Sequence, residues 1–336
     1  MGLAGLAATA LPGVHATAIR AQGTGAPRVA LMTTRAAGDL GAVDDLIAHL
    51  ARAETELGVA TTHIVASDPA DWEPTIRRLA QNGHRIIAVT WDAVEASLAT
   101  AAAAFPDVRF IGIDGGPTVP ALPNVITVAF DTHLGCHLAG VLSGGATLTR
   151  LLGVVGGVAG PRPHANANAF AAAALGVDST AEVTAAFAGT WTDRATGRDL
   201  ATRLVDAGTD ILLANAGATD LGVVEVAQES GTFVIGGSEA IVAVAPATVM
   251  ATVAVLRGQA LLEQIRAALD PGFTAGHLRS GIADGMVDLV VSDRFLAEGP
   301  AEMVERVSYA LPLMDDARQA LIAGTLTPRM DTLPPE

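Results

Sequence analysis

Aromatic residues, basic residues and cysteine are all scarce in this sequence. The 336 residues include only three Trp, one Tyr and eight Phe, so a buried core has to be built from Ala, Val, Leu and Ile. Twenty basic residues against 35 acidic ones give a formal net charge of −15, and there is no basic run. Nucleic acid and anionic membranes are therefore not expected as partners. The single cysteine, Cys136, excludes an intrachain disulfide and any metal site made of several cysteines.

The first residues are apolar and suggest export. Residues 1–16 are rich in Ala and Leu and end in a small-x-small site, Val14-His15-Ala16, as the second half of a secretory signal does. A flexible Ala-rich terminus is the alternative. We interpret residues 1–26 as a signal-peptide remnant or flexible N-terminus, and we expect a periplasmic protein. No later segment reaches about 18 continuous apolar residues, so no membrane span is predicted.

Short apolar runs alternate with helical periodicity along the rest of the chain. Residues 29–33 read as a buried strand, and apolar side chains then follow helical spacing over 40–57. This alternation predicts an α/β fold with parallel sheets flanked by helices. The pattern restarts after Phe130, so two units of about five strands each are expected. Half the residues are apolar and the length suits two domains. Two terminal helices are predicted over 301–307 and 315–323.

Several motifs occur in the order known from one family. Asp71-Trp72-Glu73-Pro74, with Ile76, Leu79 and Gly83 after it, resembles "D-Y-E-P-x-I-x-x-L-x-x-x-G". Similar landmarks lie at 105–114, 123–140, 216–223 and 245–249. Together they resemble the basic membrane protein family, which comprises substrate-binding proteins of ABC importers and includes purine-nucleoside receptors. The likeness runs from about Arg28 to Pro328.

This resemblance implies a type I periplasmic binding protein. Such a protein has two Rossmann-like lobes joined by a hinge of crossing strands, with ligand in the cleft between them. Open parallel sheets bind ligands beyond the carboxyl ends of their strands, which agrees with a cleft site. We predict lobe 1 from residues 27–129 plus about 247–276, and lobe 2 from 130–246 plus about 277–310. Residues 311–336 are predicted to form a C-terminal helix and tail.

Tryptophans are the aromatic candidates for the ligand site. In nucleoside-binding members of the family, aromatic side chains sandwich a base, and every base has a π-face that can stack. Trp91 follows the predicted strand 86–90, and Trp191 stands at the family's "G-S-[FYW]-x-D" position. Both are predicted to contact the ligand, with packing as the alternative. Trp72 is interpreted as a packing residue.

Acidic and hydroxyl candidates follow from the same resemblance. Asp39 and Asp44 lie where the family has "N-D-x-S-F-N", although Asp39 could also cap a helix. Ser238 replaces the Asp that holds ribose in the family, and Val255 replaces a common Lys. A site that loses buried partners for ribose loses discrimination for it. A free nucleobase or another small heteroaromatic ligand is therefore favoured over an ordinary purine nucleoside.

Three amides complete the predicted site. Asn166, Asn168 and Asn215 are expected near the cleft side of lobe 2. An amide offers a donor and an acceptor together, which suits the edge of a base. Capping or turn formation is the alternative for Asn166 and Asn168.

Enzymatic and metal sites have little support. Residues 236–240 approach the nucleophile-elbow pattern G-x-S-x-G, but the last Gly is Ala and His277 is the only His downstream. His133 and His137 are spaced i,i+4 without an obvious third ligand. No phosphate-binding motif is present. We therefore expect no catalysis, no metal and no cofactor.

The combined prediction is a periplasmic solute-binding protein of an ABC importer that binds a nucleobase or nucleoside-like ring between its lobes. The expected partners are this small molecule and an ABC permease in the inner membrane, and a monomer is expected. The alternatives are a receptor for a purine nucleoside or flavin-like ligand, a ligand sensor for a signalling partner and, distantly, a hydrolase.

Overall fold

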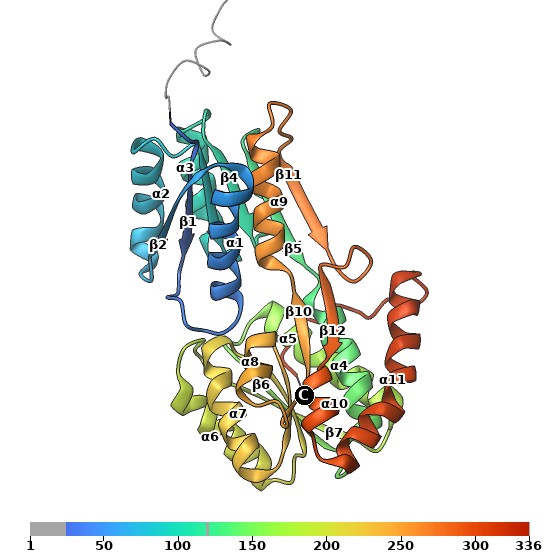
Figure 1. Ribbon diagram of the computed structural model, residues 1–336. Helices are drawn as coiled ribbons and strands as arrows, with labels where there is room; N and C mark the ends of the chain where they lie inside the picture. Colours follow the sequence, from blue (N-terminus) through green and yellow to red (C-terminus); the bar gives the residue numbers. More distant parts are fainter. Residues whose placement is uncertain (1–24, 119–120, 336) are drawn as a thin grey trace, which may run out of the picture.

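Two six-stranded sheets, each flanked by helices, form the two lobes of the protein (Figure 1). The computed structural model describes residues 25–118 and 121–335. The predicted signal segment lies almost wholly outside these described residues. Within them, no helix is long and apolar enough to cross a membrane.

The sheet of lobe 1 is entirely parallel, in the order β11-β5-β4-β3-β1-β2. Buried aliphatic residues line both faces of its central strands, as expected for a sheet covered by helices on each side. Its strands are β1 (Arg28–Thr33), β2 (Ala60–Val65), β3 (Ile86–Thr90), β4 (Arg109–Ile113), β5 (Val125–Phe130) and β11 (Gly276–Ser280). Its helices are α1 (Ala42–Leu57), α2 (Trp72–Gln81), α3 (Glu95–Ala104) and α9 (Arg257–Leu269), with 3-10 turns at Pro69–Asp71 and Asp92–Val94.

The sheet of lobe 2 has the order β12-β10-β9-β8-β6-β7, and only the β10–β12 pair is antiparallel. Its strands are β6 (Leu151–Gly156), β7 (Glu182–Phe187), β8 (Ile211–Asn215), β9 (Phe233–Gly236), β10 (Val249–Val255) and β12 (Val287–Val291). Its helices are α4 (Thr132–Ala146), α5 (Pro161–Val177), α6 (Arg194–Asp206), α7 (Asp220–Ser230), α8 (Glu239–Val244), α10 (Asp293–Glu298) and α11 (Ala301–Ile322), with a 3-10 turn at Gly217–Thr219.

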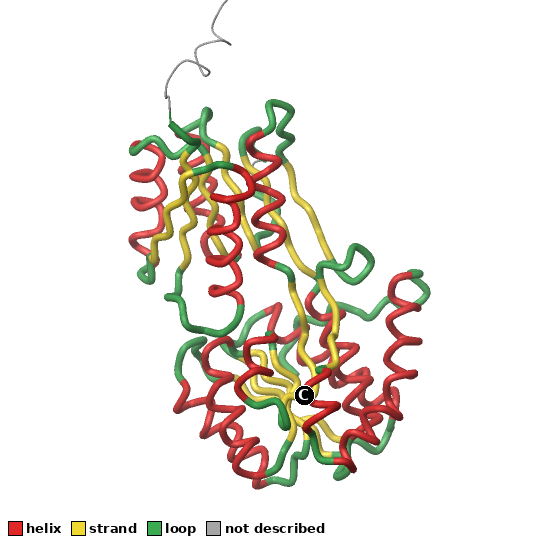
Figure 2. The backbone as a smooth tube through the Cα atoms, viewed as in Figure 1, coloured by secondary structure: helices red, strands yellow, loops and turns green. Residues whose placement is uncertain are grey.

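Three connections join the lobes, as the family resemblance implied (Figure 2). The chain leaves lobe 1 between β5 and α4, returns between β10 and α9, and leaves again between β11 and β12. Backbone hydrogen bonds hold these connections to one another: Asp131 N donates to Ser280 O over 2.8 Å, and Leu256 N donates to Met286 O over 3.0 Å. The lobes are therefore coupled by a hinge of three short connections: Asp131, Leu256 and residues 281–286, the last of which form a turn.

Close contact between α4 and α5 positions the side of the cleft that lobe 2 provides. A Cβ at Gly140 would collide with the carbonyl oxygen of Phe170, and one at Gly144 would lie 2.8 Å from the carbonyl oxygen of Ala174. Glycine permits this approach because it has no side chain. The first turns of α5, which carry Arg162 and Asn166, are thereby fixed against the core of lobe 2.

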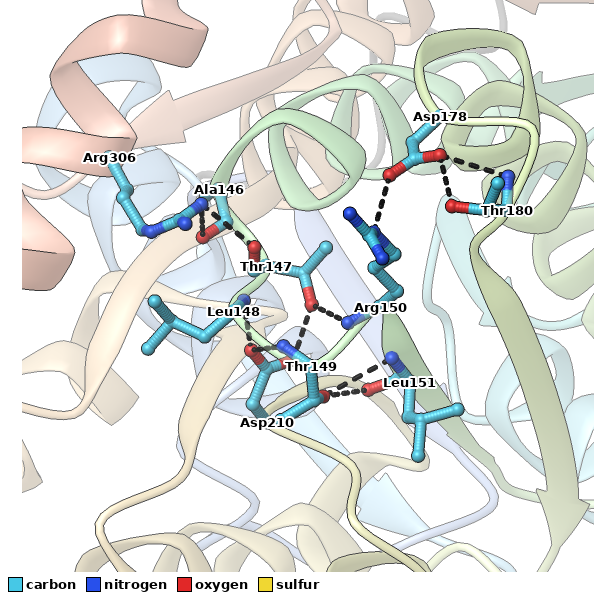
Figure 3. A network of polar contacts seen from close by, with 10 residues as sticks. All are labelled: Ala146, Thr147, Leu148, Thr149, Arg150, Leu151, Asp178, Thr180, Asp210 and Arg306. Atoms are coloured by element: carbon cyan, nitrogen blue, oxygen red, sulfur yellow. Dashed lines mark hydrogen bonds and ion pairs between the residues drawn. The ribbon is translucent and has the colours of Figure 1, made fainter.

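A polar network fixes the turn from α4 into β6 (Figure 3). The Asp210 carboxylate accepts hydrogen bonds from the Thr147 hydroxyl (2.7 Å) and the Thr149 backbone N–H (3.1 Å). The Thr147 hydroxyl in turn accepts the backbone N–H of Arg150 over 2.9 Å. Arg306 of α11 donates to the carbonyl oxygen of Thr147 over 2.8 Å, so the network also ties the C-terminal helix to lobe 2.

Three details differ from the sequence predictions. β10 lies in lobe 2 and β11 in lobe 1, because the chain crosses at Leu256 and at 281–286, not near 247 and 277. Each lobe has six strands instead of about five, and in lobe 1 the additional strand is β11. The two predicted terminal helices are one, α11, which continues through Pro312. Pro312 has no N–H group, so the carbonyl group of Ser308 loses its usual intrahelical hydrogen bond. Both residues are exposed, and water can therefore satisfy that carbonyl group.

Candidate functional site

A cleft of about 540 Å³ lies between the lobes, where the carboxyl ends of the parallel strands of both sheets converge. Its lining comes from the segments that follow strands β1 to β9 and from the start of α5. A second cavity of about 410 Å³ lies at the amino ends of β6 and β7, away from these loops. Because ligands of open α/β sheets bind beyond the carboxyl ends of the strands, we place the site in the interlobe cleft.

The guanidinium group of Arg35 lies over two tryptophan rings from opposite lobes. Its Cζ atom is 4.4 Å from the ring centroid of Trp91, which follows β3, and 5.3 Å from that of Trp191, which follows β7. Both distances are those of cation–π contacts. Burial lowers the pKa of Arg35, although its ordinary value is so high that the group stays charged. The two predicted tryptophans thus both line the cleft and face one planar group.

The backbone is strained where lobe 1 meets the cleft. Leu40, Trp91 and Asp114 have positive φ angles of 48°, 74° and 60°, which residues other than Gly rarely adopt. Such conformations cost of order 1–3 kcal/mol each and cluster at functional sites. The Trp91 N–H donates to the carbonyl oxygen of Ile113 over 2.8 Å, and this bond holds the strained turn in place. The indole Nε1 of Trp91 is buried without a hydrogen-bond partner.

Asp114 joins the lobes through an ion pair. Its carboxylate is 2% exposed and contacts Arg162 of α5, at 3.0 Å, and Arg257 at the start of α9. Burial alone would raise the pKa of this carboxyl, but the two guanidinium groups outweigh it and hold the pKa below its ordinary value. Asp114 therefore stays ionised and links loops of both lobes.

Two further acids lie in the cleft lining. Asp39 accepts backbone N–H groups from Gly41 (2.9 Å) and Val43 (3.1 Å), so it stabilises the start of α1 while lining the cleft. Asp220, at the start of α7, is buried and accepts the N–H of Ala216 over 2.8 Å. Burial raises the pKa of Asp220 to about 8, and the nearby charge of Asp39 adds to the effect. Asp220 is therefore mostly protonated at neutral pH.

Three of the predicted polar residues also line the cleft. The amides of Asn166 and Asn215 are 3.4 Å apart, Nδ2 to Oδ1. The Ser238 hydroxyl donates to the carbonyl oxygen of Leu40 across the cleft, and Ser238 Oγ accepts the N–H of Ile241 at the start of α8 over 3.4 Å. Ser238 thus connects the two lobes.

Two predicted site residues lie outside the cleft lining. The Asp44 carboxylate accepts the backbone N–H groups of Gly38 (2.8 Å) and Leu40 (2.9 Å), so it braces its own loop. The Asn168 amide donates to the carbonyl oxygens of Asp331 (3.0 Å) and Leu333 (2.9 Å) in the C-terminal tail. Neither residue is part of the site proposed below.

The sequence prediction missed several lining residues, which are Arg35, Arg162, Asp220, Arg257 and Met330. Arg35 and Asp220 each follow a parallel strand, and this position is a signal that could have found them. Met330 belongs to the tail held by Asn168, and nothing in the sequence placed it there. Trp72 also lines the cleft, while its Nε1 donates to the carbonyl oxygen of Ala66 over 2.8 Å, as suits a packing residue.

The histidines and the cysteine do not form a metal site or a reactive thiol in the described part of the chain. Among residues 25–118 and 121–335, no cluster of three or more His, Cys, Asp or Glu could hold a metal ion. Burial lowers the pKa of His133 and His137, so both imidazoles are neutral at pH 7. Burial also raises the pKa of the Cys136 thiol to about 12, so this group is inert at neutral pH.

Comparison with known proteins gives the family. A sequence profile described as "ABC transporter substrate-binding protein PnrA-like" matches residues 27–308. The chain is 25% identical to a purine-binding protein of Brucella abortus over 223 residues, 66% of this chain and 62% of that protein. It is 24% identical to an ABC transporter nucleoside-binding protein of Lactococcus lactis, over 49% of this chain and 47% of that protein. The matches thus span about half to three fifths of these relatives.

Solved structures share the fold. A solute-binding protein of an ABC transporter system from Aeropyrum pernix superposes with a TM-score of 0.79 at 19% identity, covering 90% of this chain and 92% of that one. A periplasmic solute-binding protein from Actinobacillus succinogenes superposes with a TM-score of 0.63 at 15% identity, covering 80% and 98%. These likenesses give the type I periplasmic binding protein fold. With the profile match over most of its length, the chain belongs to the PnrA-like family of ABC transporter substrate-binding proteins.

Proposed function

We propose that this chain is the periplasmic binding component of an ABC importer and that its ligand is a purine nucleobase or a closely similar heteroaromatic ring. It performs no chemistry. Ligand stabilises a closed arrangement of the two lobes by hinge motion, and an ABC permease recognises that arrangement. The names of its purine-binding and nucleoside-binding relatives support this class of ligand.

The observation that carries the proposal is the pair of indoles at the cleft. Trp91 and Trp191 come from different lobes, yet both lie against the same planar guanidinium group. Two indoles that both lie against one flat group suit a flat ring, which would stack on both. Because the indoles belong to different lobes, a ring held by both would also draw the lobes together.

Two polar features favour a free base over a nucleoside. The Ser238 hydroxyl already donates to the carbonyl oxygen of Leu40, so its proton is not free for a ribose oxygen. Val255, which replaces a lysine common in the family, lines the cleft and offers no hydrogen bond. A nucleoside is the alternative, supported by the Lactococcus relative.

Isothermal titration calorimetry tests the proposal. Stacking contributes about 1–3 kcal/mol per base, so we expect Trp91→Ala and Trp191→Ala each to weaken binding of a purine base by roughly 5- to 150-fold. Tyr309→Ala, which removes an exposed aromatic ring on α11, should leave the affinity unchanged. Full retention of affinity in both Trp variants would reject the stacked ring, and tighter binding of guanosine or inosine than of any free base would favour the nucleoside alternative.

The gene neighbourhood separates import from sensing. We expect genes for a permease and an ATPase beside the gene for this chain. A neighbouring signalling gene, with no permease or ATPase gene nearby, would instead favour a ligand sensor.

A further inference from the structure

The carboxylate acceptors of the cleft are already engaged by donors of the protein. Asp39 receives three backbone N–H groups, at 2.9, 3.1 and 3.3 Å. Asp114 receives the guanidinium groups of Arg162 and Arg257. Asp220 receives a backbone N–H over 2.8 Å and, being mostly protonated at neutral pH, is a poorer acceptor than a carboxylate. Little acceptor capacity is therefore left for a ligand on these acids.

The unpaired polar atoms of the cleft are donors. Five buried side-chain nitrogen or oxygen atoms have no hydrogen-bond partner in the part of the chain that the structure describes. Two of them belong to the cleft lining, Arg35 Nε and Trp91 Nε1. Each carries a hydrogen and has no acceptor capacity. A buried donor without a partner is costly, so a ligand acceptor that reaches Arg35 Nε would stabilise the complex. The indole N–H of Trp91 lies in the plane of its ring, so a ligand stacked on that ring does not accept it.

The charge of the cleft also favours a ligand that carries hydrogen-bond acceptors. Its titratable lining residues are Arg35, Asp39, Asp114, His133, Arg162, Asp220 and Arg257. With Asp220 protonated and His133 neutral, three guanidinium groups face two carboxylates, so the cleft is locally positive in a chain of net charge −15. The amides of Asn166 and Asn215 can present either a donor or an acceptor and do not alter this balance.

We propose that the cleft selects rings with carbonyl-rich edges, such as 6-oxopurines, over aminopurines, and that Arg35 is the residue that sets this preference. The inference rests on the proposed function, because it assumes that the ring lies between Trp91 and Trp191. A ring stacked on both indoles takes the place that the guanidinium group of Arg35 occupies. That long side chain then turns to the edge of the ring, where its N–H groups bind carbonyl oxygens or an anionic ring.

Calorimetric titrations of the intact chain with hypoxanthine, xanthine and adenine test the proposal. We expect both oxopurines to bind at least tenfold more tightly than adenine. A hydrogen bond to a charged group is a strong one, so Arg35→Gln should weaken oxopurine binding about 10- to 100-fold while changing adenine binding less than threefold.

Two controls separate a specific effect of Arg35 on binding from a general effect of losing an arginine or the fold. Arg294→Gln removes an exposed guanidinium group on α10 that pairs with Glu298, and it should change no affinity. Far-ultraviolet circular dichroism of Arg35→Gln should match that of the unaltered protein. Adenine binding as tightly as the oxopurines, or an equal loss of both in Arg35→Gln, would overturn this inference while leaving the proposed function in place. Binding of no purine base at all would reject the proposed function, and this inference with it.

Discussion

At the scale of single residues, Asp220 makes stability depend on pH in an unusual direction. Its pKa is about 8 in the folded chain against an ordinary value of 3.8. Between these values the folded chain keeps a proton that the unfolded chain releases. The free energy of unfolding therefore falls as pH rises from about 4 to about 8, by up to about 1.4 kcal/mol per pH unit from this group. Most carboxylates that are paired in the folded state act in the opposite direction.

Asp220→Asn should remove this loss of stability with rising pH. The amide oxygen can still accept the N–H of Ala216, but the side chain no longer has to ionise in a buried position. We expect the variant to be more stable than the unaltered protein at pH 7–8, and the difference to vanish near pH 4. Urea unfolding at pH 4, 6 and 8 measures it. An equal difference at all three pH values would contradict the raised pKa.

Residue positions show how far the sequence predicts the site. Trp91 could be identified because it directly follows the predicted strand 86–90, and Trp191 because it stands in a family motif in the loop after β7. The loops after parallel strands converge at the cleft. Asp39 and Asp44 could not be told apart, because which carboxylate faces the cleft depends on how the loop between β1 and α1 closes. Arg162 enters the cleft from a helix start in lobe 2 to reach Asp114 in lobe 1, and no local pattern signals a contact between lobes.

At the scale of elements, strands with buried faces are the predictable part of the fold. β3 is buried at every position, and its apolar run identifies it directly. β11 is exposed or half-buried throughout and has the sequence Gly-His-Leu-Arg-Ser, so no apolar pattern predicts it. It is a strand because β5 offers it a parallel partner. The boundaries of the lobes were misplaced because β10 and β11 lie beside the crossings.

The α4–α5 contact yields a prediction with a matched control. In Gly140→Ala, the new methyl group would collide with the backbone of Phe170, and overpacking of this kind costs about 1–3 kcal/mol. Gly176→Ala, in α5, meets no atom within 4 Å and should stabilise the protein by about 0.5–1 kcal/mol, because Ala is the better helix former. Thermal unfolding of both variants measures the difference. A stabilising effect of Gly140→Ala would contradict the close packing.

At the scale of the whole molecule, the chain is two lobes connected three times and joined across the cleft by a few polar contacts. Asp114 with Arg162, and Ser238 with Leu40, connect residues of opposite lobes. Arg35 contacts an indole from each lobe. These contacts across the cleft are few compared with the packing contacts inside each lobe. Hinge motion is therefore the expected response to a ligand.

Tryptophan fluorescence tests the central claim, a flat ring between Trp91 and Trp191, most directly. The chain has three tryptophans, and the third, Trp72, holds its indole N–H against the carbonyl oxygen of Ala66. Titration with hypoxanthine should quench the emission until one ring is bound per chain, and the double variant Trp91→Phe and Trp191→Phe should show little of this quenching. Unchanged emission at saturating ligand, or equal quenching in the double variant, would contradict the account.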